Sequence, residues 1–257
     1  MLTLSLITKI LFLCVAAFLA AFVDSIAGGG GLISLPAFMA AGVSPHIALG
    51  TNKFCASCGS LTSVLAFIKS KKIDFDFLKY LLPFSLLGAI AGVNTVLKVD
   101  EKLLETLVLI LILSVGVYSI FSKSIGKENN FKGATKLNIF LGIILAFCLG
   151  FYDGFFGPGA GSLLIFGLIK IFGFDFVQAA GNGKLLNFVS NITSLILFAI
   201  HGQIDYLIGI PMAIFMILGA KFGTSLAINK GSKLIKPIFI TMSLALGCKI
   251  LIQNFLQ

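Results

Sequence analysis

The sequence predicts an all-α, multi-pass membrane protein made of two related halves. Hydrophobic residues make up 58% of the 257 residues, charged residues only 11%, and the mean hydropathy is +1.08. A soluble domain typically has about 25% charged residues, so we expect most of this chain to lie in lipid. Two further observations support this fold class. The chain contains apolar runs of about the 20 residues that a spanning helix needs, and it contains an internal repeat.

The internal repeat aligns residue 48 with residue 179, a spacing of 131 residues. The segment 48–53, Ala-Leu-Gly-Thr-Asn-Lys, is matched by 179–184, Ala-Ala-Gly-Asn-Gly-Lys. Repeats in a strongly apolar chain are typical of secondary transporters, whose binding site lies where the halves meet. We therefore divide the chain into a first transmembrane repeat, a cytoplasmic connecting loop and a second transmembrane repeat, at 1–121, 122–136 and 137–257.

Roughly eight apolar runs have the length of a membrane-spanning helix. They are expected near 4–23, 47–68, 77–97, 103–121, 137–152, 179–200, 206–226 and 233–252. Two shorter runs, at 32–43 and 162–174, follow glycine-rich breaks and are expected to form half-length helices. Irregular backbone at membrane depth is tolerated only where protein or a water-filled cavity satisfies its polar groups. The breaks at 28–31 and 157–161 are therefore expected to line a cavity.

The loop charges predict that the two repeats are inverted relative to each other. The loop at 69–72 carries three lysines, whereas its counterpart at 201–203 carries none. The following loop reverses this trend, because 98–102 balances two acids with two lysines and its counterpart holds Lys230, Lys233 and Lys236. Cytoplasmic loops carry the excess of positive charge. The net charge of +9, which comes from 19 lysines and no arginine, is thus explained by topology rather than by a nucleic-acid surface.

Four charged residues recur at related positions of the two repeats. Asp24 and Asp153 each precede a glycine break, and Lys53 and Lys184 each lie several residues inside a long apolar span. Ionisable groups at membrane depth are costly and point to function. Each acid could carry a coupling proton or cap the amides where the helix restarts. Each lysine could instead extend its ammonium group to the membrane surface.

The glycine breaks complete a predicted anion site. A half-helix that begins inside the membrane presents free N–H groups and the positive end of its dipole, which favours anions. Pro158 suits a helix start because it lacks the N–H that would be unpaired there. The candidate substrate-binding residues are Gly28, Gly29, Gly30, Gly31, Asn52, Lys53, Gly157, Pro158, Gly159, Gly161, Asn182, Lys184 and Asn187. Asp24 and Asp153 are candidate coupling or structural acids.

The motifs resemble those of the TauE/SafE family of sulfite exporters over almost the whole chain. An Asp, a Gly cluster and a hydrophobic-Pro segment are present at 24–36, and Pro-His-Ile-Ala-Leu-Gly-Thr-Asn at 45–52. The second-half signature is present at 150–161, followed by Lys-Leu-Leu-Asn-Phe at 184–188. The resemblance implies a plasma-membrane carrier for sulfite, sulfoacetate or a similar anion.

Together these observations predict a transporter of a small anion that works by alternating access in the inner cell membrane. The alternatives are an anion channel and, less favoured, a membrane-embedded enzyme. The enzyme is less favoured because the two histidines, His46 and His201, lie far apart in sequence. We expect no catalytic residues, no metal site and no cofactor. The expected partners are the anion and the lipid bilayer, not nucleic acid, and assembly into a homo-oligomer is left open.

Overall fold

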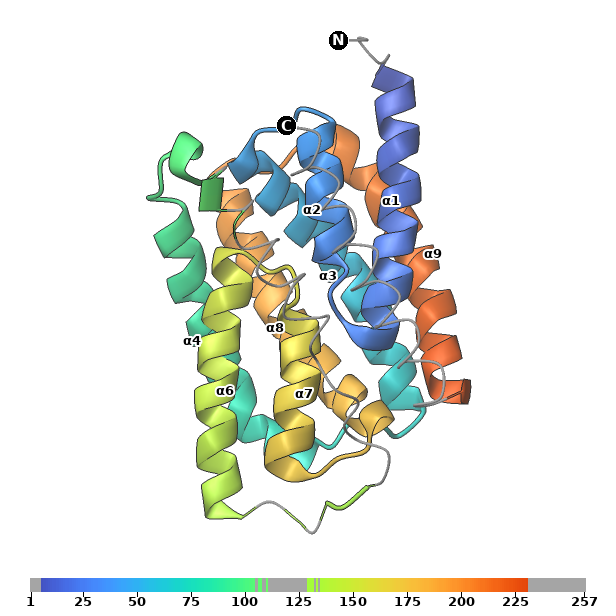
Figure 1. Ribbon diagram of the computed structural model, residues 1–257, viewed down its shortest axis with the longest axis vertical. Coiled ribbons are helices and arrows are strands. Elements are labelled where there is room, and N and C mark those ends of the chain that lie inside the picture. The colour runs from blue at the N-terminus through green and yellow to red at the C-terminus, as the bar shows by residue number, and fades with distance from the viewer. Residues whose placement is uncertain are drawn as a thin grey trace, which may run out of the picture.

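A computed structural model describes residues 6–104, 106–107, 110, 129–131, 133 and 135–230. Within this part of the chain all regular structure is helical (Figure 1). The first half holds α1 (Leu6–Ala27), α2 (Gly31–Ala40), α3 (Pro45–Lys69) and α4 (Phe75–Val96). The second half holds α6 (Lys136–Phe155), α7 (Ala160–Phe172), α8 (Phe176–Ile200) and α9 (Tyr206–Lys230).

Among the described residues, five helices are long and apolar enough to cross a membrane, namely α1, α4, α6, α8 and α9. They coincide with five of the predicted spans. Helix α3 fills the predicted span at 47–68, but it is more polar than the other long helices. The predicted half-length helices are confirmed as α2, with 10 residues, and α7, with 13. The predicted span at 233–252 and most of that at 103–121 lie outside the described residues, so the count of eight stays a prediction.

Local sequence signals set the helix boundaries. The side chain of Asp74 accepts a hydrogen bond from the backbone N–H of Asp76 at the start of α4, and Asp175 caps the start of α8 in the same way. Such side chains replace the missing partners of the first helical amides. Helix α1 ends where Gly28 and Gly29 take φ values of +76° and +88°. These values favour glycine, so the break is encoded in the sequence.

The long helices pack as two pairs, and each pair takes one helix from each half. Helix α1 lies along α9, and α4 lies along α6 (Figure 1). A Cβ atom added at Gly88 would lie 2.2 Å from the carbonyl oxygen of Phe147, and one at Gly219 would lie 2.2 Å from that of Phe18. Small residues allow helices to approach this closely in membranes. The two contacts are related by the internal repeat.

The helix directions differ between the halves. In the view of Figure 1, α1 begins at the top, whereas α6, which occupies the same place in the second half, begins at the bottom. Large apolar side chains remain exposed on the outer helices, including Ile7 at 71%, Leu137 at 65% and Leu207 at 65%. Such exposure is expected where side chains face lipid tails rather than water.

Candidate functional site

The two glycine breaks pack against each other at the centre of the molecule. A Cβ atom added at Gly28 would lie 2.3 Å from the backbone nitrogen of Ser162, and one at Gly31 would lie 3.0 Å from the Cα of Pro158. The hydroxyl of Ser162 donates a 3.0 Å hydrogen bond to the carbonyl oxygen of Ala27. The contact between the halves is therefore made by backbone at these positions, and side chains would not fit.

The four repeated charges form two ion pairs that cross between the halves. Lys53 of α3 lies 2.8 Å from Asp153 of α6, and Lys184 of α8 lies 2.7 Å from Asp24 of α1. Both lysine side chains are buried, at 2% and 3% exposure. The alternative that these lysines extend to the membrane surface is therefore wrong. Charges without a partner at this depth would be very costly, and the pairing reduces that cost.

The pair of Lys53 and Asp153 lies in a dense hydrogen-bond network. Asn187 Nδ2 donates to Asp153 Oδ2 at 3.2 Å, and the hydroxyl of Ser190 donates to the same oxygen. Lys53 Nζ also donates to Asn191 Oδ1 at 3.0 Å. The Asp153 side chain is only 3% exposed. Because three side chains donate to it, this carboxylate is held in place from α3 and from α8.

The pair of Lys184 and Asp24 is more open. Asp24 Oδ1 accepts a 3.1 Å hydrogen bond from the backbone N–H of Gly30, so this acid caps the amides before α2 as well as pairing with a lysine. Lys184 Nζ donates to Asp24 Oδ2 at 2.7 Å and to the Asp24 backbone oxygen at 2.8 Å. The Asp24 side chain is 26% exposed. Asp24 thus makes the predicted capping contact and also pairs with a lysine, which the sequence analysis did not predict.

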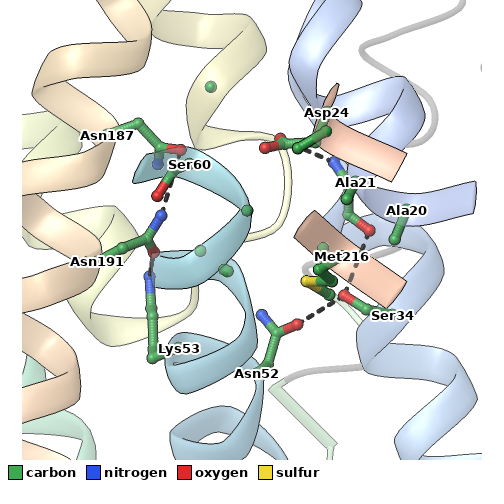
Figure 2. Close-up of a pocket in the computed structure, with 18 of the residues that line it drawn as sticks. Ala20, Ala21, Asp24, Ser34, Asn52, Lys53, Ser60, Asn187, Asn191 and Met216 are labelled. Atoms are coloured by element: carbon green, nitrogen blue, oxygen red, sulfur yellow. Dashed lines mark hydrogen bonds between the residues drawn. The ribbon is translucent and has the colours of Figure 1, made fainter. Parts of the chain in front are cut away.

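A cavity lies beside these pairs, and its walls come from α1, α2, α3, α6, α7, α8 and α9 and from both glycine breaks. Its free volume is about 40 Å³, which is room for a few water molecules or a small ion rather than a large organic molecule. In Figure 2, Asn52 meets Ser34 on one side, and Lys53 meets Asn191 on the other. The cavity is lined by Ala20, Ala21, Asp24, Gly29, Gly30, Gly31, Ser34, Asn52, Lys53, Ala56, Gly59, Ser60, Ser63, Asp153, Gly157, Gly159, Gly161, Asn187, Asn191, Met216 and Ala220.

Most of the candidate site residues meet at this cavity. Four of them do not line it, namely Gly28, Pro158, Asn182 and Lys184. Gly28 and Pro158 form the contact between the breaks, and Lys184 holds Asp24 from behind. The interpretation of Pro158 as the start of a helix is wrong, because Gly159 is the N-cap and α7 begins at Ala160. Its carbonyl oxygen instead accepts a 2.7 Å hydrogen bond from the hydroxyl of Tyr152.

Asn182 has a structural contact instead. Its Oδ1 accepts a 2.8 Å hydrogen bond from the backbone N–H of Asp74, at the start of α4. The equivalent residue of the first half, Thr51, accepts a 2.9 Å bond from the backbone N–H of Asp205, just before α9. Each half thus holds the start of a long helix of the other half, and these contacts repeat the crossed pattern of the ion pairs.

Sequence reasoning missed several polar residues of the cavity wall. Ser60 and Ser63 lie on α3, and Ser34 lies inside the half-length helix α2. Ser57, Ser60 and Ser63 recur at every third position within an apolar span, and residues three apart lie on one face of a helix. A polar face along the predicted span 47–68 could have revealed them.

The charges of the site cancel, whereas the sequence predicted a positively charged anion site. Two lysines and two aspartates face one another, so the lysines and helix ends do not form an unpaired positive site. Asn52 retains a free donor among the described residues, because its Oδ1 accepts from Ser34 Oγ at 2.7 Å while no contact involves its Nδ2. Amide, hydroxyl and backbone N–H groups around a small volume suit an oxyanion. No group of three or more metal-ligating side chains is found among the described residues.

Sequence comparison identifies the family. A model of the family described as Sulfite exporter TauE/SafE matches residues 13–250. The chain belongs to the TauE/SafE family. Membership makes it part of a family of membrane transporters, and the apolar helices agree with a multi-pass membrane protein.

Relatives named as probable membrane transporters match nearly the whole chain. A Haemophilus influenzae protein named Probable membrane transporter protein is 37% identical over 232 residues, which is 90% of each chain. Probable membrane transporter protein YfcA of Escherichia coli is 38% identical over 238 residues, 93% of this chain and 88% of that one. Probable membrane transporter protein YunE of Bacillus subtilis is 24% identical over 269 residues. No solved structure matches the chain.

Proposed function

We propose that the protein moves a small anion, sulfite or a related organosulfur or organic anion, across the inner cell membrane by alternating access. The observation that carries this proposal is the cavity itself. It lies beside two broken helices, and polar groups from both halves line it. Family membership supports the transport of an anion, because the family is described as sulfite exporters.

In this proposal the chain is built from two inverted repeats, at 1–121 and 137–257, joined by a cytoplasmic loop at 122–136. The crossed contacts support such a relation, since two contacts made by one half each have a counterpart in the other. Lys53 with Asp153 is matched by Lys184 with Asp24, and Thr51 with Asp205 by Asn182 with Asp74. Broken helices at the contact between inverted repeats are where transporters of this architecture bind substrate.

The anion binds between the glycine break before α2 and the polar face of α3. Asn52 Nδ2 and the backbone N–H groups of Gly29 and Gly31 donate hydrogen bonds, since no contact occupies them among the described residues. Lys53 contributes positive charge at the cavity wall. Gly157, Gly159, Gly161 and Asn187 complete the wall from the second half. Gly28, Pro158 and Asn182 support the site without touching the anion, and Lys184 is paired with Asp24.

The substrate class is tested by flux into proteoliposomes that contain the purified protein. Labelled sulfite, thiosulfate, sulfate, sulfoacetate and taurine are compared at equal pH on both sides. Saturable, protein-dependent uptake of a sulfur-containing anion is expected. Flux that does not saturate would favour the channel, and conversion of a probe by protein in detergent would favour an enzyme. If none of the anions moves, the proposed function is wrong.

The inverted orientation is tested by labelling single cysteines in a variant without the five native cysteines. Cysteines at Lys71 and Lys230 are expected to react from the cytoplasmic side, and a cysteine at Gln203 from the outside. The reason is the reversed loop charge of the two halves. Labelling of positions 71 and 203 from the same side would contradict the inversion but would leave the anion site untouched.

A further inference from the structure

The charge balance of the cavity sets a condition on any anion that enters it. Among the described residues the ionisable side chains at the site are Asp24, Lys53, Asp153 and Lys184, two of each sign. A bound monoanion would leave this buried site with a net negative charge. It would also lie near Asp24 and Asp153, which both line the same small volume. Unscreened like charges at close range repel strongly at low dielectric.

The two acids differ in what the loss of their charge would do. Asp153 accepts hydrogen bonds from Lys53, Asn187 and Ser190. Its side chain is 3% exposed. Neutralising it would leave Lys53 buried with only Asn191 as a partner. Such an uncompensated buried charge is strongly unfavourable. Asp153 is therefore suited to stay charged.

Asp24 is suited to gain a proton. Its side chain is 26% exposed and lines the cavity, so a proton can reach it with the anion. When Asp24 is neutral, Lys184 keeps a partner, because its Nζ also donates 2.8 Å to the Asp24 backbone oxygen. The Gly30 N–H and the Lys184 ammonium, which the carboxylate now bridges at 3.1 Å and 2.7 Å, would then be free to bind another oxyanion.

We infer that Asp24 is the proton-coupling residue of this carrier, so that a monovalent oxyanion binds together with one proton at Asp24 and replaces its carboxylate at Gly30 and Lys184. This inference rests on the proposed transport function. One proton and one monoanion leave the net charge of the site unchanged, so each step is electrically neutral. The direction of flux then follows the combined gradients of anion and protons.

Among the described residues Asp153 is the only other acid that lines the cavity, and its hydrogen bonds from Asn187 and Ser190 favour its charged form. Lys184 from α8 pairs with Asp24, and Lys53 from α3 and Asp153 from α6 line the cavity. Helix α2 carries no charged residue. The lysines of α7 and α9, which are Lys170, Lys221 and Lys230, are exposed at the surface.

Binding as a function of pH tests this assignment. The full-length protein in detergent is titrated with methanesulfonate, whose charge is constant between about pH 6 and about pH 8, and with sulfite. Affinity is expressed as the ratio of wild type to Asp24→Asn, so that the titration of sulfite itself cancels. For one coupled proton the wild-type affinity rises as the pH falls, by up to about tenfold per pH unit. Asp24→Asn mimics the protonated acid and is expected to bind equally well at every pH.

Two control variants separate coupling from structure. Asp24→Glu keeps a titratable group and is expected to keep the pH dependence. Asp153→Asn, which removes the related acid, is expected to keep the same pH dependence even if its affinity is lower. In proteoliposomes, wild-type methanesulfonate influx should acidify the lumen by one proton per anion, and influx through Asp24→Asn should not.

The possible results have distinct meanings. A wild-type affinity that does not change with pH, or an equal pH dependence in Asp24→Asn, would overturn the proton-coupling role and leave anion transport standing. If Asp153→Asn alone removed the pH dependence, the assignment would be overturned in favour of the other acid. If neither anion bound at any pH, the anion site itself would fail and the inference with it.

Discussion

The ion pairs Lys53–Asp153 and Lys184–Asp24 occupy equivalent places in the two halves but lie in different surroundings. Asp153 is almost fully buried, whereas about a quarter of Asp24 is exposed at the cavity. The same contrast holds for two serines: Ser63 lines the cavity, while the hydroxyl of its counterpart Ser194 is buried without a hydrogen-bond partner among the described residues. The first half thus exposes its acid and its serine to the cavity more than the second half does. Equivalent residues of the two halves therefore differ in their access to the cavity.

The largest difference between the halves is expected from removing each lysine. Lys53→Met leaves Asp153 as an uncompensated buried charge and should destabilise the protein by about 3–5 kcal/mol. Lys184→Met should cost clearly less, because Asp24 is partly exposed and keeps the Gly30 N–H. The free energy of unfolding in detergent is measured for both variants at one pH and compared with that of the wild type.

A double variant is the control for this prediction. Adding Asp153→Asn to Lys53→Met removes the unpaired charge and keeps an acceptor for Asn187 and Ser190, so part of the stability should return. Equal losses in the two single variants would show that exposure does not distinguish the pairs.

The second largest loss of stability is expected from a substitution at the contact between the glycine breaks. Gly28→Ala places a methyl group 2.3 Å from the backbone of Ser162, in addition to the strain of a φ of +76°. Overpacking adds about 1–3 kcal/mol to about 1–2 kcal/mol for the left-handed backbone. Transport and the midpoint of thermal unfolding should both fall.

Gly42→Ala is the matched control for the break. Gly42 has nearly the same φ, +78°, but a Cβ there would meet nothing within 4 Å. Gly42→Ala should therefore lose only the stability that the backbone strain costs, and it should retain transport. If both variants lost transport and stability to the same extent, the close approach of the two breaks would not matter for function.

The internal repeat predicted the charged residues of the site but not how they pair. The repeat aligned Asp24 with Asp153 and Lys53 with Lys184, and the half-length helices followed from the glycine-rich breaks. The repeat could not say which lysine meets which acid, because pairing within a half and pairing across the halves fit the same alignment. That choice depends on α3 and α8 lying between helices of the other half, which is a property of tertiary packing.

A smaller effect is expected at the polar wall of the cavity. Asn52→Ala removes the free amide donor beside Ser34 and should weaken anion binding by about fivefold, the worth of about 1 kcal/mol for one hydrogen bond. The equivalent position of the second half, Gly183, does not line the cavity, and a Cβ there would make an ordinary 3.5 Å contact with Ile165. Gly183→Ala should leave affinity unchanged. Binding of labelled sulfite at fixed salt compares the two.

The smallest effect concerns the crossed contacts at the helix starts. Thr51→Val removes the acceptor of the Asp205 N–H and should cost about 1 kcal/mol. Asn182→Thr keeps an acceptor for the Asp74 N–H and removes Nδ2, which has no partner in the described part of the chain. That change should be neutral or slightly stabilising in thermal unfolding. A large loss in Asn182→Thr would show that the amide group has a partner of its own.

The crossed ion pairs also bear on how such a chain could arise. When two copies of one protein associate about a twofold axis, every contact occurs twice, because residue i of one copy meets residue j of the other and the reverse. The contacts of Lys53, Asp153, Lys184 and Asp24 have this form within a single chain. A half-length ancestor with one lysine and one aspartate would have gained both pairs on dimerising. Fusion of its duplicated gene would then have freed each acid to change separately, and only after fusion could Asp24 and Asp153 acquire different surroundings.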